Sequence, residues 1–203
     1  ESGPGFGGSC FKKDILNLVY LAEHFGLPEV ADFWEGVVKL NNWHQHRISK
    51  LIVKKLFGTI SNKKISILGF SFKANTNDTR ESSSITICKD LIEEGAFLKI
   101  HDPKVTPYQI AKDLGSISVS KNKERKGVSH FQKGWSFYDN LYESAKDVDA
   151  VVVLTEWEEY KNINWQLIAD SMRRPAWVFD ARSILNTRNV ISSGLQLWRL
   201  GKG

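Results

Sequence analysis

The sequence predicts an α/β protein in which a long helical N-terminal segment is followed by a Rossmann-like, doubly wound parallel sheet. Two patterns support this fold class. Short, continuous apolar runs recur between Ile65 and Phe179, as expected of strands that are buried on both faces of a parallel sheet. Helical periodicity separates these runs, and strands that alternate with helices over units of about 30 residues are typical of a doubly wound sheet.

The composition is that of an ordinary globular protein. Of the 203 residues, 41% are hydrophobic and 25% are charged, and no apolar run approaches the roughly 20 residues of a membrane span. The net charge of +5 suits anionic small molecules. The basic run Lys121–Lys126, with Lys133 nearby, lies among Ser, Gly and Asn residues and is interpreted as a solvated loop. We therefore expect neither a nucleic-acid partner nor a membrane.

The cysteine content indicates a reducing compartment. Cys10 and Cys88 are too few for a disulfide framework, and no C-x-x-C pair suggests zinc. His44 and His46 fall on different helix faces, so we expect no metal site. An unpaired reactive thiol is best kept in the cytoplasm, which is the predicted location.

Two helices are predicted before the first strand. Apolar residues at helical spacing from Phe11 to Ala22 indicate the first helix, and Gly26 ends it. Pro28 opens the second helix, which runs to about Phe57. A helix of about 30 residues spans about 45 Å, which is more than one small core requires. We therefore expect it to connect domains, to contact a partner, or both.

Strands and helices alternate through the rest of the chain. The predicted strands are Ile65–Phe70, Phe97–Ile100, Ala150–Leu154, Ala176–Asp180 and, at an edge, Gly194–Leu200. The predicted helices are Ser82–Glu94, Thr106–Leu114, Leu141–Ala145 and Trp165–Met172, and the polar stretch Gly115–Trp135 is interpreted as an insertion. We therefore assign residues 1–60 to the opening loop and helical segment, and residues 61–203 to the sheet domain.

The beginning of the chain indicates a piece of a longer protein. The sole methionine is Met172, and the chain opens in a glycine-rich loop without a preceding strand. We therefore expect further sequence before Glu1.

A candidate nucleophile follows this opening loop. The run Gly5–Ser9 delivers Cys10 to the start of the first helix, and Asp14 stands one turn later on the same face. The helix N-terminus, together with Lys12 and Lys13, should favour the thiolate. This arrangement is expected of a nucleophile beside a base, and a small buried structural cysteine is the alternative on this pattern alone.

Polar residues also follow the predicted strands, where ligands bind in an open parallel sheet. These residues are Lys73, Asp102, Thr155, Glu156, Asp180 and Arg182. Lys73 and Arg182 could converge on an anion such as a diphosphate, and Arg80 is a further cation. The opening glycines match G-x-G-x-x-G without the strand that this fingerprint requires, and Gly69–Phe72 lacks the glycines. A mononucleotide or a nucleotide sugar therefore fits this crevice better than a dinucleotide.

Several motifs, in one order, resemble the UDP-glucose/GDP-mannose dehydrogenase family. They are Gly5–Asp14, Asn17–Tyr20, Leu27–Val30, Ile67–Lys73, Asp78–Ser84, Asp102–Val105, Thr155–Trp157 and Phe179–Arg182. The resemblance covers essentially the whole chain. It implies the family's cysteine loop, central helix and C-terminal nucleotide-sugar domain, without the N-terminal Rossmann domain that binds NAD.

The resemblance also implies a reaction. Enzymes of this kind oxidise UDP-glucose twice at C6 to UDP-glucuronate and reduce NAD. Cys10 would add to the C6 aldehyde, forming a thiohemiacetal and later a thioester that water hydrolyses. Asp14 would activate water or carry protons. Without the NAD-binding domain, the isolated chain is expected to be inactive.

Further residues are assigned by the same resemblance. Gly5, Phe6 and Gly7 match the loop that holds the sugar, and Phe72, Lys73 and Arg182 match substrate contacts. Cys10, Phe11, Lys12, Lys13 and Arg80 match positions that NAD contacts. The central helix implies a homodimer or a higher homo-oligomer. The chain departs from the usual family pattern at Ala74, Asn75, Asn77 and Ala181, which puts cofactor affinity or domain closure in question.

Three alternatives remain beside this interpretation. The substrate could be another nucleotide sugar, such as GDP-mannose or a UDP-N-acetylhexosamine, although Ser9-Cys10-Phe11 favours the glucose enzyme. The chain could instead be a dimerisation and nucleotide-sugar-binding module without chemistry of its own. A cysteine-dependent hydrolase is disfavoured because no histidine near Cys10 could act as its base.

Overall fold

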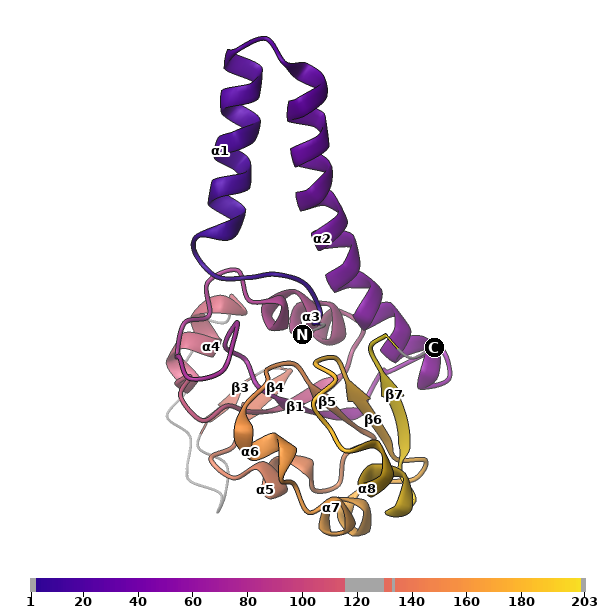
Figure 1. Ribbon diagram of the computed structural model, residues 1–203. Coiled ribbons are helices and arrows are strands. Elements are labelled where there is room, and N and C mark those ends of the chain that lie inside the picture. The colour runs from indigo at the N-terminus through magenta and orange to yellow at the C-terminus, as the bar shows by residue number, and fades with distance from the viewer. Residues whose placement is uncertain (1–2, 116–129, 133, 202–203) are drawn as a thin grey trace.

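The computed structural model describes residues 3–115, 130–132 and 134–201, so the basic run Lys121–Lys126 and Lys133 lie outside the described residues. The described residues form a seven-stranded sheet with helices on both faces, from which a helical hairpin projects (Figure 1). The strand order is β3 (His130–Gln132), β4 (Trp135–Phe137), β2 (Phe97–His101), β1 (Lys64–Leu68), β5 (Ala150–Val153), β6 (Trp177–Asp180) and β7 (Gln196–Arg199).

The sheet confirms the predicted fold class. Every neighbouring pair of strands is parallel except β3 and β4, which run antiparallel. The five predicted strands are present as β1, β2, β5, β6 and β7, and β7 lies at an edge. The interpretation of Gly115–Trp135 as an insertion missed β3 and the start of β4. Each of these strands has three residues, which is too short for a periodic pattern.

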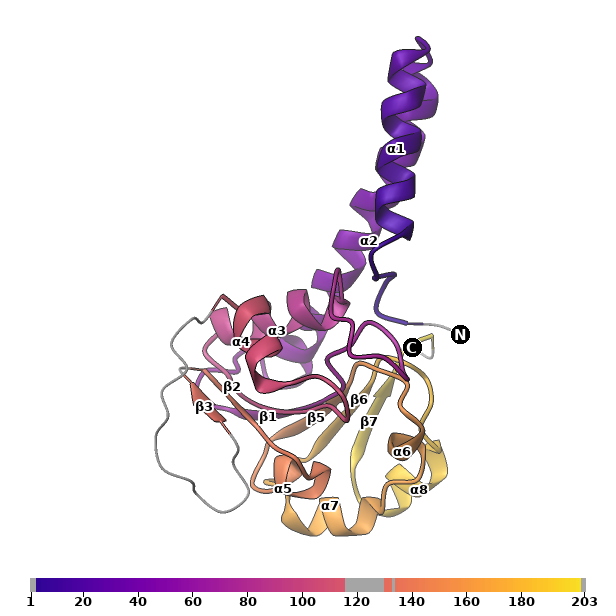
Figure 2. The same cartoon turned by 90° about the vertical axis from the view of Figure 1, so that its left-hand side faces the viewer.

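Helices cover both faces of the sheet (Figure 2). One face carries α3 (Ser83–Glu93), α4 (Pro107–Asp113) and the C-terminal part of α2 (Pro28–Lys55). The other face carries α5 (Leu141–Ala145), α6 (Glu158–Lys161), α7 (Trp165–Ser171) and α8 (Thr187–Ser192). The short helices α6 and α8 were not predicted.

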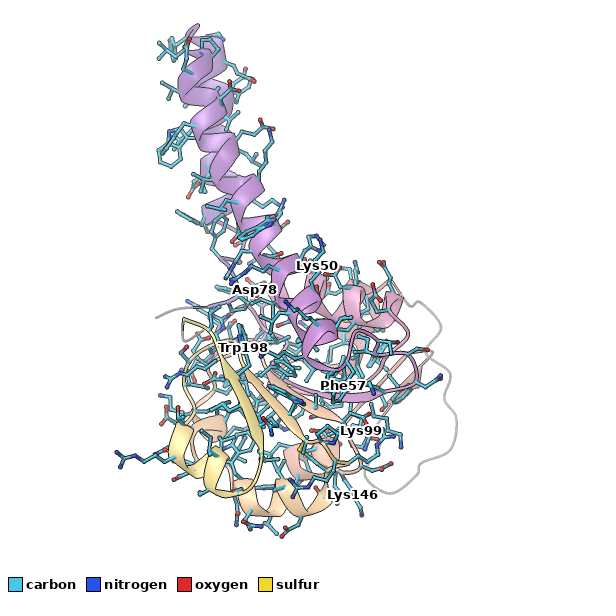
Figure 3. The ribbon with its side chains drawn as sticks, turned by 90° about the vertical axis from the view of Figure 1, so that its right-hand side faces the viewer. Lys50, Phe57, Asp78, Lys99, Lys146 and Trp198 are labelled. Carbon is cyan, nitrogen blue, oxygen red and sulfur yellow. The ribbon has the colours of Figure 1, made fainter. Side chains whose placement is uncertain are left out.

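The hairpin consists of α1 (Phe11–His24) and α2, as predicted. Ile15 and Ala22 of α1 are buried beside Ala31 and Val38 of α2. The 28-residue α2 then continues from the projecting hairpin onto the sheet, where Ile52 is fully buried (Figure 3). Among the described helices, none is long and apolar enough to cross a membrane.

Much of the hairpin surface is apolar and exposed. Large exposed side chains on α1 and α2 are Phe11, Leu16, Leu18, Tyr20, Leu21, Val30, Phe33, Leu40 and Trp43. Apolar side chains exposed in this number on one helical hairpin are typical of a surface that contacts a partner.

Candidate active site

Cys10 stands at the N-terminal boundary of α1. It is the N-cap residue of that helix, and its side chain is exposed. The amide of Asp14 donates to the Cys10 carbonyl at 2.9 Å, which places the exposed Asp14 one turn further along the helix. The Ser9 Oγ lies 3.7 Å from the Cys10 Sγ. The thiol of Cys10 and the carboxylate of Asp14 therefore both lie exposed in the first turn of α1.

Asn41 of α2 holds the loop before Cys10 by two hydrogen bonds to Phe6. The Phe6 amide donates to Asn41 Oδ1 at 2.8 Å, and Asn41 Nδ2 donates to the Phe6 carbonyl at 3.1 Å. Gly5 lies directly against the same side chain, because a Cβ there would be 2.7 Å from Asn41 Oδ1. The Phe6 ring packs edge-on against the ring of Phe11, with centroids 4.8 Å apart. This loop is thus fixed before the chain enters α1.

The same loop also lies against the segment that joins β1 to α3. The Gly8 amide donates to the Arg80 carbonyl at 2.9 Å. A Cβ at Gly7 would lie 2.4 Å from the Glu81 carbonyl oxygen, so only glycine permits this approach. Lys12 Nζ forms an ion pair of 2.7 Å with Glu81. The structure therefore brings the cysteine loop onto the loop of Phe72, Lys73 and Arg80.

Two of the predicted cofactor cations, Lys12 and Arg80, have acidic partners within the chain. Besides the Lys12–Glu81 pair, Arg80 donates from Nε to Asp78 Oδ1 at 2.9 Å and from a terminal nitrogen to Asp78 Oδ2 at 2.6 Å. The hydrogen bonds from Arg80 lower the pKa of the Asp78 carboxyl below its ordinary value. Lys13 is exposed. Lys12 and Lys13 follow Cys10 closely in sequence, and Arg80 lies near enough to Cys10 to interact with it electrostatically.

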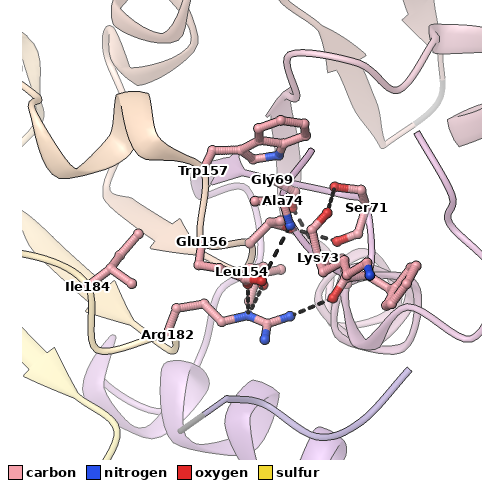
Figure 4. A network of polar contacts seen from close by, with 12 residues as sticks. Gly69, Ser71, Lys73, Ala74, Leu154, Glu156, Trp157, Arg182 and Ile184 are labelled. Atoms are coloured by element: carbon pink, nitrogen blue, oxygen red, sulfur yellow. Dashed lines mark hydrogen bonds and ion pairs between the residues drawn. The ribbon is translucent and has the colours of Figure 1, made fainter. Parts of the chain in front are cut away.

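The predicted substrate residues meet at the carboxyl ends of the strands (Figure 4). Arg182 follows β6, and its Nε donates to the Leu154 carbonyl at 2.7 Å. A terminal nitrogen of Arg182 donates to the Phe72 carbonyl at 2.9 Å. Lys73 is exposed, and its Nζ lies 5.3 Å from the centre of the Phe72 ring. The structure thus brings Phe72, Lys73 and Arg182 together, as their positions after parallel strands predict.

Three consecutive side chains after β5 connect the other strand ends. Thr155 Oγ1 donates to the Ser71 carbonyl at 2.7 Å. Glu156 lies between Arg182 and the backbone of Ala74 (Figure 4). Trp157 Nε1 donates to Asp102 at 3.3 Å. These three residues fasten the loops that follow β1, β2 and β6 to one another.

The acid at the end of β2 is paired within the chain. Asp102 stands where a Rossmann strand offers an acid to a ribose, but it is buried, and its Oδ2 accepts from the Phe70 amide at 2.7 Å and the Ser71 amide at 3.0 Å. Asp102 therefore fastens the loop after β1 to the end of β2, and its carboxylate already has these donors.

The sequence reasoning missed the residues that position the loops. Asn41 received no role, although a polar residue on the buried face of the predicted second helix was an available signal. Glu81 was counted within a motif, but neither its ion pair with Lys12 nor its contact with Gly7 is visible from spacing. Glu156 was noted as a polar residue at a strand end without a role.

The comparisons with known proteins agree with this arrangement. Residues 66–187 match the UDP binding domain of the UDP-glucose/GDP-mannose dehydrogenase family, and residues 1–43 match its central domain. UDP-glucose 6-dehydrogenase of Drosophila melanogaster is 43% identical over 202 residues, which is 100% of this chain and 41% of that protein. UDP-glucose 6-dehydrogenase 2 of Arabidopsis thaliana is 44% identical over 210 residues, covering 100% of this chain and 43% of that protein.

A solved structure shares the fold. The UDP-glucose dehydrogenase of Pyrobaculum islandicum superimposes with a TM-score of 0.70 at 25% identity, over 92% of this chain and 37% of that one. The chain spans about two-fifths of the length of the curated relatives it matches. By the extent of these matches, the chain belongs to the UDP-glucose/GDP-mannose dehydrogenase family.

Proposed function

We propose that this chain supplies the reactive cysteine and the nucleotide-binding domain of a UDP-glucose 6-dehydrogenase, which oxidises UDP-glucose at C6 to UDP-glucuronate. The observation that carries this proposal is the contact between two loops. The loop of Cys10 lies on the loop of Phe72 and Arg80, whose Phe72 carbonyl is held by Arg182. This contact between the two loops supports a site in which the nucleophile and the residues proposed to bind the diphosphate serve one nucleotide sugar.

Cys10 is proposed as the nucleophile. Its exposed thiol would add to the aldehyde carbon at C6 and form a thiohemiacetal. Loss of a hydride from this adduct to NAD would give a thioester, which water would hydrolyse to the carboxylate and the free thiol. Asp14, one turn along the same helix, takes or returns protons in these steps. Covalent capture divides a four-electron oxidation into separate steps.

The remaining site residues are proposed to hold the substrate. Gly5, Phe6 and Gly7 form the loop that holds the sugar, and Phe72, Lys73 and Arg182 hold the UDP part. The two cations complement the diphosphate, and the guanidinium of Arg182 is suited to phosphate oxygens.

NAD is the hydride acceptor of this family of dehydrogenases. Because Asp102 at the end of β2 is already paired within the chain, we propose that NAD is bound mainly by sequence outside this chain. The proposed contribution of this chain consists of Cys10, Phe11, Lys12, Lys13 and Arg80. The isolated 203-residue chain is therefore predicted to produce no NADH from UDP-glucose.

We propose two functional parts and a self-association surface. Residues 1–60 form the cysteine loop and the helical dimerisation segment, and residues 61–203 bind the UDP-sugar. The exposed apolar side chains of the hairpin support a homodimer or a higher homo-oligomer. A cytoplasmic location suits the free thiol of Cys10. Sedimentation of the chain only as a monomer at micromolar concentration would contradict the dimer.

Two binding measurements test the proposal. Calorimetry should show tighter binding of UDP-glucose than of GDP-mannose or a UDP-N-acetylhexosamine, and the reverse order would assign another nucleotide sugar. The C6 aldehyde of UDP-glucose should protect Cys10 from iodoacetamide more strongly than UDP-glucose itself does. Equal protection by both compounds would contradict a covalent role for the thiol, while leaving a binding module.

A further inference from the structure

Glu156 has no role in the proposed function, but it contacts the Ala74 amide and the Arg182 guanidinium at the proposed nucleotide site. Its Oε1 accepts from the Ala74 amide at 3.3 Å, and its Oε2 lies 3.2 Å from Arg182 Nε (Figure 4). Both side chains are largely withdrawn from solvent, with exposed fractions of 25% for Glu156 and 14% for Arg182. The carboxylate is thus a negative charge inside a site that is proposed to bind an anion.

The contact between Glu156 and Arg182 is an attraction of charges without a good hydrogen bond. Arg182 Nε carries a single hydrogen, which it donates to the Leu154 carbonyl at 2.7 Å. Glu156 Oε2 is buried, and because Arg182 Nε gives its hydrogen to Leu154, this oxygen has no hydrogen-bond donor among the described residues. A pair of this kind is weaker than a bidentate carboxylate–guanidinium pair, so an incoming anion can replace it.

A terminal nitrogen of Arg182 is committed to a neutral acceptor. It donates to the Phe72 carbonyl at 2.9 Å. A phosphate oxygen is a stronger acceptor for a guanidinium than a carbonyl is, because the hydrogen bond is charge-assisted. The neighbouring Glu156 opposes such a ligand, because its like charge repels phosphate and offsets part of the positive charge of Arg182.

We propose that Glu156 determines specificity in the nucleotide-sugar site by competing with phosphate for Arg182. The ligand class is a nucleoside diphosphate, and the inference rests on the proposed function, in which Arg182 contacts the UDP part. Glu156 lowers affinity in proportion to the negative charge of the ligand. The site therefore discriminates against bare phosphate anions and relies on the nucleoside for affinity.

The test is calorimetry of the 203-residue chain with UDP, pyrophosphate and uridine. Glu156→Gln removes the charge and keeps an oxygen for the Ala74 amide. The UDP dissociation constant should fall by about fivefold at low salt, the size expected for removing one unit charge roughly 8 Å from a phosphate at an intermediate dielectric constant. Pyrophosphate should gain more than UDP, and uridine should be unchanged. The gain should shrink in about 0.5 M salt because the screening length is then shorter than the assumed distance between the carboxylate and the phosphate.

Two further variants serve as controls. Glu158→Gln removes a nearby charge whose side chain is 78% exposed and paired with Lys161, so UDP affinity should stay at the wild-type value. Glu156→Asp keeps the charge and should not bind UDP more tightly than wild type. Urea unfolding of each variant checks that it is folded, and Glu156→Ala replaces Glu156→Gln if the latter is not.

The outcomes separate this inference from the proposed function. Weaker or unchanged UDP binding by a folded, charge-free variant would overturn the role of Glu156 alone, provided that the wild-type chain binds UDP. Failure of the wild-type chain to bind UDP would overturn the proposed nucleotide site, and this inference with it.

Discussion

The side chain of Asn41 pairs with both backbone polar groups of Phe6. It accepts from the Phe6 amide at 2.8 Å and donates to the Phe6 carbonyl at 3.1 Å, as a neighbouring strand would. Asn41 is 9% exposed, so both hydrogen bonds are largely shielded from water. A single side chain of α2 thus fixes the course of the loop four residues before Cys10.

Replacing Asn41 should therefore destabilise the protein. Asn41→Ala leaves the amide and the carbonyl of Phe6 without partners, and the free energy of unfolding should fall by about 2 kcal/mol. Asn42→Ala is the matched control, because Asn42 is exposed on the same helix and should change stability by less than about 0.5 kcal/mol. Urea unfolding measures both variants, and equal stabilities would contradict the role of Asn41.

Alanine substitutions at Gly7 and Gly36 should change the stability of the protein in opposite directions. Gly7→Ala places a Cβ 2.4 Å from the Glu81 carbonyl oxygen, so the two loops must separate, at a cost of about 1–3 kcal/mol. Gly36→Ala lies within α2, where a Cβ meets nothing within 4 Å, and should stabilise the chain by about 1 kcal/mol. Thermal unfolding at low protein concentration compares them. A neutral Gly7→Ala variant would show that the loops are not in contact.

The two cysteines should differ sharply in reactivity. Cys10 is exposed, whereas Cys88 is fully buried in α3, and burial raises the pKa of the Cys88 thiol well above its ordinary range. Since the thiolate is the reactive form, iodoacetamide should label one site in the native chain and two in denaturant. Mass spectrometry of peptides locates the label. If iodoacetamide labels Cys88 in the folded Cys10→Ser variant, Cys88 is not buried.

Stability should fall in mild acid because of His101. The His101 side chain is buried, and its Nδ1 lies 3.0 Å from the Tyr160 hydroxyl oxygen. Burial lowers the pKa of His101 below its ordinary value of 6.5, although the nearby Asp102 and Asp139 act in the opposite direction. The unfolded chain therefore takes up the proton first. This contribution to stability is present above pH 6.5 and is lost as the pH falls toward the folded pKa.

The measurement compares wild type with His101→Gln. Urea unfolding between about pH 7.5 and pH 5.5 brackets the ordinary pKa of histidine. The difference in unfolding free energy, wild type minus variant, should decrease steadily as the pH is lowered. Parallel pH profiles would show that His101 does not titrate in this way.

The sequence predicted most of the fold because its long elements carry clear patterns. The helices α1 and α2, and the buried strands β1, β5 and β6, stood out by apolar periodicity and turn residues. It missed β3 and β4, and also α6 and α8, because these short segments lack the continuous apolar runs that marked β5 and β6 and are too short to show a helical period. Their structure depends on tertiary pairing.

The residues of the candidate site were predicted from residue type, from position after a strand, and from the family resemblance. Arg182 could be anticipated because parallel strands end at one edge. The partners that hold the residues could not, because the pairs Asn41–Phe6 and Lys12–Glu81 join segments 35 and 69 residues apart. Such pairings follow from the relative placement of two elements, which no local pattern encodes.

Cys10 and the residues proposed to bind the diphosphate belong to different parts of the fold. Cys10 begins the projecting hairpin, whereas Lys73 and Arg182 follow strands of the sheet. In the proposed function, a nucleotide sugar that reaches from the thiol to Arg182 would link the α1–α2 hairpin to the sheet domain. Occupancy should slow amide exchange in the loop of residues 5–10 as well as in the residues it touches, and loss of the ligand should loosen the hairpin.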